Sequence, residues 1–395
     1  MSSVNQGGNP TGEAPGVISP SVSSSSPITP ISAPVSRFAF VDGLRGIAAL
    51  SILIFHLWWY EPKPWPTLES YPAIVDAAFM KLRGGVQILL VVSGFVIAYT
   101  LRKTWFTGPE VVSFIGRRLA RLIPAYWVVL FAVILLDLVC RHLLTLPSPM
   151  DGHLTATRIV AHMAFLQDVA DVGALSAGIW TLCIEMQFYV VAVLGWGLAQ
   201  RLFRRPDQNL PQPSPWGLLI VFGPLALASL FHWRTMESTS PWITHFLWMF
   251  FLGMCTWWTL DRTVPRLVLL GLIVIAIVEL YLDAEWRYEN SMALLTALAI
   301  YSAGRLNALH LWLNWGPLQY LGRISYSLYL IHFPVCHLIV SAGWKTYGNS
   351  PTQVQSQVIH LVAIVASLVA GHLLYILVEA PSARWAARLK RAESS

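Results

Sequence analysis

The chain has 395 residues, of which 55% are hydrophobic and 12% are charged. The charged share is about half of the roughly 25% found in ordinary soluble proteins, which excludes a soluble enzyme. A net charge of +6 is the excess that basic residues flanking membrane spans produce, so we expect no nucleic-acid partner. The composition predicts an all-α, polytopic membrane helix bundle embedded in a lipid bilayer.

Residues 1–36 form a tail rich in Ser, Pro, Gly and Thr, with a single acid, Glu13, and no Lys or Arg before Arg37. Such a segment cannot bury enough apolar area to fold, so we expect it to be disordered. It lacks the basic start and short apolar core of a signal peptide, so the first hydrophobic run should remain as a membrane anchor. The remainder divides into a membrane domain at 37–381 and a short, basic, cytoplasmic tail at 382–395.

Hydrophobic runs close to the length that crosses a bilayer follow one another along the chain. We predict about ten transmembrane helices, at 44–60, 84–101, 122–144, 179–203, 216–232, 241–260, 265–283, 291–309, 318–340 and 357–379. With the amino terminus in the cytoplasm, most of the 26 Lys and Arg residues fall on the inner side, as the positive-inside rule requires. We therefore expect both termini in the cytoplasm.

The first predicted span carries ionisable residues on one face. Arg45 and His56 are eleven residues apart, close to three full helical turns, so both face the same side. Asp42, three residues before Arg45, extends this stripe. His56 lies about 16 Å along the helix from Arg45, near mid-membrane. An ionisable group at that depth is by default a functional candidate, and the alternative is a histidine that only packs and hydrogen-bonds within the bundle.

A cluster of arginines follows the second predicted span. Arg118 and Arg121 are three residues apart and Arg117 and Arg121 are four apart, so their guanidinium groups converge on one helix face. Guanidinium groups bind phosphate oxygens in a bidentate manner, so this cluster suits a phosphate-bearing ligand. The alternative is simple anchoring at the inner membrane surface.

Four further ionisable residues are predicted in the outer half of the membrane: Asp137, Glu185, Glu279 and His332. We interpret them as candidates to line one cavity, with structural pairing between helices as the alternative. The outer loop at 145–178 contains acids and histidines, but their spacing matches no standard metal-ligand pattern. All four cysteines lie in hydrophobic segments, so we expect neither a metal site nor a disulfide.

Five motifs in a fixed order resemble those of the acyltransferase-3 family of integral membrane acyltransferases. They are Val41–Leu50 (VDGLRGIAAL) with Phe55 and His56, Val92–Ile97 (VSGFVI), the arginine cluster with Ile123–Tyr126 (IPAY), Trp180–Tyr189 (WTLCIEMQFY) and Leu321–Pro334 (LGRISYSLYLIHFP). The resemblance extends from Phe38 to about Pro381. Some members carry a fused esterase-like domain after the last span, and we expect this chain to be a stand-alone membrane module.

The resemblance implies that an acyl group, commonly acetyl, passes from cytoplasmic acyl-CoA to a hydroxyl of a carbohydrate or another surface or secreted acceptor. It implies a bacterial inner-membrane location and no metal cofactor. Arg45 and His56 would fill the family's Arg-x10-His motif, and Arg118 and Arg121 its Arg-x-x-Arg pair. His56 would act as a general base or as a transient acyl carrier, and both roles need a neutral imidazole.

The expected site has three groups of residues. The expected catalytic residues are His56, Asp42 and Glu185, those that bind acyl-CoA are Arg45, Arg117, Arg118 and Arg121, and those that bind the acceptor are Trp180, Tyr189, Tyr326 and His332. A transporter or flippase of a glycan or small metabolite is the alternative, since intramembrane acids and histidines also build proton relays. However, the sequence has no evident internal repeat. A membrane scaffold would leave the stripe of Asp42, Arg45 and His56 unexplained.

Overall fold

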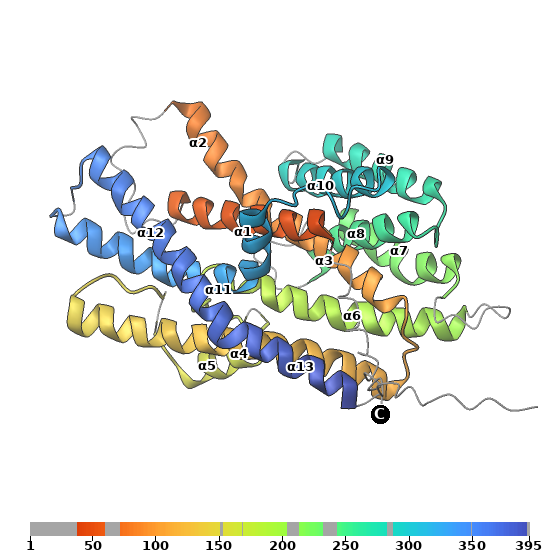
Figure 1. Ribbon diagram of the computed structural model, residues 1–395, viewed down its shortest axis with the longest axis horizontal. Coiled ribbons are helices and arrows are strands. Elements are labelled where there is room, and N and C mark those ends of the chain that lie inside the picture. Colours follow the sequence, from red (N-terminus) through yellow and green to blue (C-terminus); the bar gives the residue numbers. More distant parts are fainter. Residues whose placement is uncertain are drawn as a thin grey trace, which may run out of the picture. The chain divides into compact units, whose positions relative to one another are not determined.

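The computed structural model describes residues 38–59, 72–150, 153–167, 169–203, 213–231, 243–282, 287–348 and 350–392. The tail expected to be disordered, 1–36, lies outside these residues. Within the described part of the chain every regular element is a helix, so the predicted all-α class is confirmed (Figure 1). Residues 382–392, assigned to a basic tail from the sequence, belong to the last helix.

The helices succeed one another in the order that the hydrophobic runs predict. They are α1 (Ala39–Trp59), α2 (Ala73–Met80), η2 (Lys81–Gly84), α3 (Gly85–Leu101), α4 (Gly108–Val139), η3 (Cys140–Leu144), α5 (Ala156–Met163), α6 (Trp180–Leu202), α7 (Pro215–Phe231), η5 (Ile243–His245), α8 (Leu247–Leu260), α9 (Arg266–Leu282), α10 (Arg287–Arg305), α11 (Gly316–Thr346), α12 (Gln353–Leu374), η6 (Tyr375–Glu379) and α13 (Ala380–Ala392). Each of the ten predicted spans overlaps a helix in this order.

The number of ten membrane spans is not confirmed. Among the described residues, six helical segments are long and apolar enough to cross a membrane: Ala39–Trp58, Ala73–Leu101, Gly108–Leu144, Trp180–Leu202, Gly316–Thr346 and Gln353–Arg388. Helices α7, α8 and α9 have only 17, 14 and 17 residues, short of the roughly 20 that a span requires. Helix α10 has 19 residues but carries charged residues at both ends.

Two helix crossings in the centre of the bundle depend on glycine. Helix α1 packs against α11, and α3 packs against α8. A Cβ atom on Gly322 of α11 would overlap the Asp42 carbonyl of α1, and one on Gly94 of α3 would overlap the Phe250 carbonyl of α8. Small residues let helix backbones approach this closely in membrane proteins. These crossings bring the polar residues of α1, α3 and α11 to the interior of the bundle.

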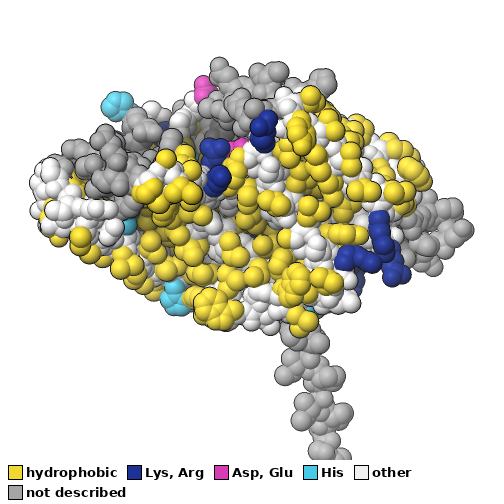
Figure 2. Space-filling view, turned by 90° about the horizontal axis from the view of Figure 1, so that it is seen from above, with side chains coloured by type: hydrophobic (Ala, Val, Ile, Leu, Met, Phe, Trp, Pro, Cys, Tyr) yellow, Lys and Arg dark blue, Asp and Glu magenta, His cyan; other side chains and the backbone are white. Residues whose placement is uncertain are grey.

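Hydrophobic side chains cover most of the face seen in Figure 2, with basic residues gathered in a few places. Large apolar residues on helices α4 and α12 are exposed, including Phe131 and Leu361. Exposing such large apolar side chains to water is unfavourable, whereas lipid can surround them. This surface therefore agrees with a membrane-embedded bundle.

The segment between α4 and α6 is held by its own buried polar side chains. Arg158 is buried and donates hydrogen bonds to the carbonyls of Gly173 at 2.8 Å and Ala174 at 2.7 Å. The fully buried His162 donates from Nδ1 to the Arg158 carbonyl at 2.7 Å and accepts at Nε2 from the Leu175 N–H at 3.0 Å. The backbone thus occupies both ring nitrogens of His162, and this pattern requires a neutral imidazole.

The close approach of α1 and α11 predicts an asymmetry between two glycine substitutions. Gly322→Ala should destabilise the protein by about 1–3 kcal/mol, because its new methyl group meets a backbone carbonyl that cannot move aside. Gly116→Ala in α4 is the matched control, since no atom lies within 4 Å of its Cβ position. The control should be neutral or raise stability by about 0.5–1 kcal/mol. Thermal unfolding in one detergent measures both, and an equal effect would contradict the proposed packing.

The His162 contacts predict a loss of stability in acid. Burial lowers the pKa of His162 below its ordinary value of 6.5. Below that pH the unfolded chain binds a proton that the folded chain does not, so stability falls as the pH decreases. The decrease in Tm between pH 7.5 and pH 5.5 should be smaller in His162→Ala than in the wild type. His153→Ala, at an exposed position in the same segment, should retain the wild-type decrease. An unchanged pH dependence in His162→Ala would contradict this role.

Candidate active site

A cavity of about 110 Å³ lies among helices α1, α3, α4, α6, α8 and α11. Three of its lining residues are arginines, Arg45 from α1 and Arg118 and Arg121 from α4. Glu185 of α6 is the one acid that lines it among the described residues. Its remaining wall is formed mostly by apolar and aromatic side chains of α3, α6 and α11. The cavity therefore concentrates positive charge and hydrogen-bond donors inside an apolar bundle.

Three carboxylates lie near the three guanidinium groups, but they do not occupy every hydrogen-bond donor. Arg45 is within electrostatic reach of Asp42, Glu185 and Glu379, and also of Arg121. Nη2 of Arg121 lies 3.6 Å from a carboxylate oxygen of Glu379, while Nε of Arg121 is buried and has no hydrogen-bond partner among the described residues. A buried donor without a partner costs about 1–3 kcal/mol. Arg121 also lines the cavity, so its guanidinium is a candidate partner for an anionic ligand there.

Arg118 is held differently, by aromatic rings. Its guanidinium carbon lies 4.7 Å from the ring centre of Tyr189 and 5.8 Å from that of Phe114. Cation–π contacts of this kind orient a guanidinium without using its hydrogen-bond donors. The aromatic rings therefore hold the Arg118 guanidinium at the cavity wall, and its N–H groups can still donate hydrogen bonds to a ligand.

Glu185 is fixed by two hydroxyl groups. Ser93 of α3 donates to its carboxylate at 3.1 Å, and the hydroxyl of Tyr189, one turn further along α6, donates to the same oxygen. The carboxylate oxygen accepts both hydrogen bonds, which link Glu185 to α3 and to the next turn of α6. Ser93, Glu185 and Tyr189 all line the cavity and form a polar patch that contacts Arg118 through the Tyr189 ring.

Two tyrosines of α11 complete the wall. The hydroxyl of Tyr326 donates to the Leu122 carbonyl at 2.8 Å. The hydroxyl of Tyr329 donates to the Gly178 carbonyl at 2.7 Å and lies 2.5 Å from the Thr181 hydroxyl. Gly178 has φ of +87°, a conformation that glycine adopts readily and that other residues rarely adopt. The segment before α6 thereby fixes a ring that lines the cavity.

His56 faces a second histidine. Its Nδ1 lies 2.8 Å from Nε2 of His332, and the two ring centres are 5.0 Å apart. His332 is fully buried, and the centre of its ring is 6.0 Å from that of Tyr329. Tyr329 lines the cavity, whereas neither histidine is among its lining residues. The histidine pair therefore lies behind the tyrosine wall, next to the cavity.

The structure brings together six of the residues predicted from the sequence. The cavity is lined by Arg45, Arg118, Arg121, Glu185, Tyr189 and Tyr326. His332, expected to contact the acceptor, instead contacts His56. Asp42 is not among the lining residues, and its charge acts on Arg45.

Two other predicted residues lie outside the cavity. The guanidinium of Arg117 donates to Ser113 on its own helix, because residues four apart share a helix face. Trp180 packs against Phe246, with ring centres 5.6 Å apart. Neither side chain lines the cavity that Arg118 and Arg121 enter.

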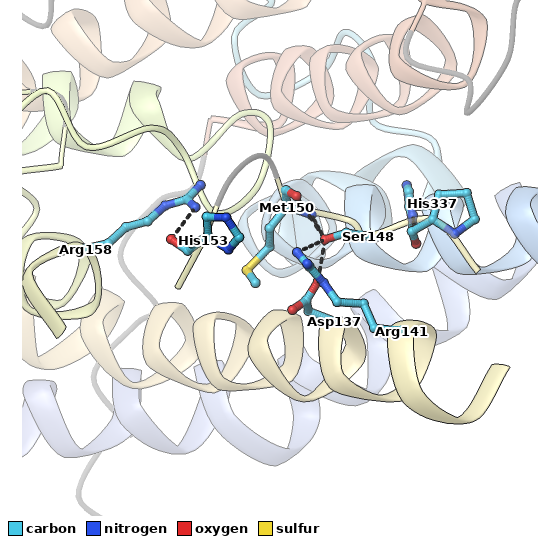
Figure 3. A network of polar contacts seen from close by, with 8 residues as sticks. Asp137, Arg141, Ser148, Met150, His153, Arg158 and His337 are labelled. Carbon is cyan, nitrogen blue, oxygen red and sulfur yellow. Dashed lines mark hydrogen bonds and ion pairs between the residues drawn. The ribbon is translucent and has the colours of Figure 1, made fainter. Parts of the chain in front are cut away.

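The prediction that Asp137, Glu185, Glu279 and His332 line one cavity is wrong, because only Glu185 does so. Asp137 accepts a hydrogen bond from Nε of Arg141 at 2.7 Å and another from Ser148, in the network of Figure 3. The pairing of Asp137 with Arg141, one helical turn away, is structural. Glu279 is buried in α9, which contributes no residue to the cavity wall.

The network in Figure 3 also ties the segment after α4 to its neighbours. The Met150 N–H donates to Ser148 at 3.0 Å, and Nε2 of His337 in α11 donates to the Pro147 carbonyl at 3.1 Å. Arg158 donates to the His153 carbonyl at 3.3 Å. These contacts organise the outer loop predicted at 145–178 and involve no residue of the cavity wall.

Sequence reasoning missed several site residues. Ser93, Thr181 and Tyr329 line the cavity, and Glu379 pairs with Arg121 from behind it. Glu379 is buried, ends the π-helical turn η6 and accepts a hydrogen bond from Ser327 at 2.7 Å. An acid at the end of the last apolar segment was a usable signal for Glu379. Tyr329 lies in the motif Leu321–Pro334, three residues after the predicted Tyr326, but its contact with Gly178 joins segments that are distant in the sequence.

Comparison with known proteins agrees with the motifs. A family model described as an acyltransferase domain matches residues 38–376 of the chain. This match includes Arg45, His56, Arg118, Arg121, Glu185 and His332, and it ends just before Glu379. No solved structure gives a significant match to the chain.

Similar proteins include two bacterial proteins that are named for acyl transfer. BcsY of Komagataeibacter xylinus, assigned as a membrane-bound transacylase, is 25% identical over 363 residues, which cover 88% of this chain and 83% of that protein. The O-acetyltransferase OatA of Staphylococcus aureus is 23% identical over 366 residues, which cover 83% of this chain. The matched region is only 55% of the length of OatA.

Proposed function

This chain belongs to the acyltransferase-3 family of membrane acyltransferases, and from that premise we propose that it transfers an acyl group, commonly acetyl, from acyl-CoA to a hydroxyl of a carbohydrate or another surface acceptor. The name of OatA supports acetyl as the group and oxygen as the accepting atom. We place the protein in a bacterial inner membrane, where acyl-CoA is available on the cytoplasmic side. The reaction needs no metal, since a thioester is already activated for attack.

The arginine-lined cavity is the observation that carries this proposal. Coenzyme A has a pyrophosphate and a 3′-phosphate, and guanidinium groups bind such oxygens with charge-assisted hydrogen bonds. Arg45, Arg118 and Arg121 converge from two helices on one cavity that contains a single acid. A transporter of neutral glycans would give no reason for gathering three half-buried cations around one cavity.

The distance between the arginines and His56 fits an extended donor. His56 is eleven residues beyond Arg45 on α1, about 16 Å along the helix. If the phosphates bind at the arginines, the pantetheine arm can extend past Glu185 and Tyr189 toward Tyr329. The thioester would then lie beside the histidine pair, with the acceptor approaching from the opposite end of α1.

His56 would perform the proton transfer in this scheme. As a general base, it takes the hydroxyl proton while the acceptor oxygen attacks the thioester carbonyl carbon. The carbon–sulfur bond then breaks, and the thiolate of coenzyme A takes the proton back from the imidazolium. As a nucleophile, His56 would instead hold the acyl group between two displacement steps. Glu185 keeps Ser93 and Tyr189 in place along the path, and Asp42 orients Arg45.

A pair of neighbouring arginines tests the donor assignment. Arg118→Gln should raise the KM for acetyl-CoA by about tenfold or more, because it removes charge-assisted hydrogen bonds to phosphate. Arg117→Gln is the matched control and should change the KM by less than about twofold, since its guanidinium lies outside the cavity. The measurement is the release of free coenzyme A by the protein in nanodiscs. His56→Ala serves as the inactive reference.

Two outcomes would contradict this proposal. One is equal loss of activity in the Arg117 and Arg118 variants, which would make the arginines a general membrane anchor. The other is a wild-type protein that releases no coenzyme A from acetyl-CoA, even with oligosaccharide acceptors present. Thermal unfolding of each variant would show whether a loss of activity reflects a loss of folding.

A further inference from the structure

The contact between His56 and His332 has a defined direction. Nδ1 of His332 lies 3.1 Å from the carbonyl oxygen of Leu328, one turn back along α11. A carbonyl oxygen can only accept, so Nδ1 of His332 must carry the hydrogen. A neutral imidazole has a single N–H group, which leaves Nε2 of His332 as an acceptor.

The tautomer of His56 follows from that of its partner. Nδ1 of His56 lies 2.8 Å from Nε2 of His332, and two lone pairs would repel each other at this separation. Nδ1 of His56 therefore donates its hydrogen to His332, and the imidazole of His56 also has a backbone hydrogen bond with Ile52, one turn back along α1. In the neutral ring, the lone pair that accepts protons is then located on Nε2 of His56.

The surroundings hold both rings in this arrangement. His332 is fully buried and His56 is nearly so. The rings of Phe55 and Phe333 lie 5.5 and 5.8 Å from the centre of the His56 ring. Because aromatic packing restricts ring rotation, the hydrogen bond to His332 selects one orientation of His56 as well as one tautomer.

We infer that His332 is a positioning residue that sets the tautomer of His56, so that Nε2 of His56 is the atom that accepts a proton or the acyl group. This inference rests on the proposed acyl transfer. When Nε2 takes a proton, the ring becomes an imidazolium and its Nδ1–H bond to His332 becomes charge-assisted. The proton moves from the acceptor hydroxyl to Nε2, while the Nδ1 hydrogen remains on His56. His332 thus corresponds to the orienting third group found behind many catalytic bases.

Two amide substitutions at one position separate this role from packing. In His332→Gln the amide oxygen can occupy the place of Nε2 and accept the hydrogen of His56. In His332→Asn the amide can replace Nδ1 and bond Leu328, but it cannot reach His56. We expect His332→Gln to retain kcat within about fivefold and His332→Asn to lower kcat by about 100-fold. The KM for acetyl-CoA should stay within about twofold in both, because the arginine cavity is intact. Equal losses of kcat in the two variants, or full activity in His332→Asn, would overturn the inference.

A tautomer measurement tests the inference without any activity. Nitrogen-15 NMR of histidine-labelled wild-type protein in nanodiscs should show a protonated Nδ1 and a bare Nε2 for His56, assigned with His56→Gln. A protonated Nε2 on neutral His56 would overturn the inference even if the enzyme is active. A wild-type protein that shows the expected tautomer but releases no coenzyme A would instead contradict the proposed function. The two failures are therefore distinguishable.

Discussion

Placing cationic guanidinium groups inside an apolar bundle is unfavourable unless acceptors or water surround them, and this constraint organises the interior of the protein. Arg45, Arg118 and Arg121 reach one cavity from two helices. Glu379 pairs with Arg121 from behind the cavity, and Glu185 lines the wall with two hydroxyl donors. The three arginines have more hydrogen-bond donors than the protein offers acceptors to them. A polyanionic ligand requires such an excess of donors.

The family motifs combine two physical functions. In the first motif, Arg45 enters the cavity and Gly46 lies against the backbone of α11. In the second, Ser93 holds Glu185 while Gly94 lets α3 approach α8. In each pair, the glycine lets neighbouring helices approach closely enough for the adjacent polar residue to reach its partner. Each motif therefore places a polar residue of the site directly before a glycine that permits close helix packing.

Patterns of residues along the sequence predicted well only those features that depend on residues close together in the chain. Each of the ten predicted hydrophobic runs overlaps a helix, whereas α2, α5 and α13 were not predicted, and three-residue spacing placed both Arg118 and Arg121 at the cavity. The start of α4 was missed by fourteen residues, because the Thr107 capping box extends the helix through a polar stretch. Asp137 was assigned to a cavity although Arg141, four residues later, was already its best partner. The contacts of Tyr329 with Gly178 and of His56 with His332 depend on packing between distant segments, which spacing along one helix cannot specify.

The most direct test of the account is a cryo-EM structure of the full chain in nanodiscs, bound to a non-hydrolysable acetyl-CoA analogue. The account predicts phosphate groups within hydrogen-bond distance of Arg45, Arg118 and Arg121, and a sulfur position on the side of the cavity that faces His56. An analogue bound at another surface, with the arginine cavity empty, would contradict it.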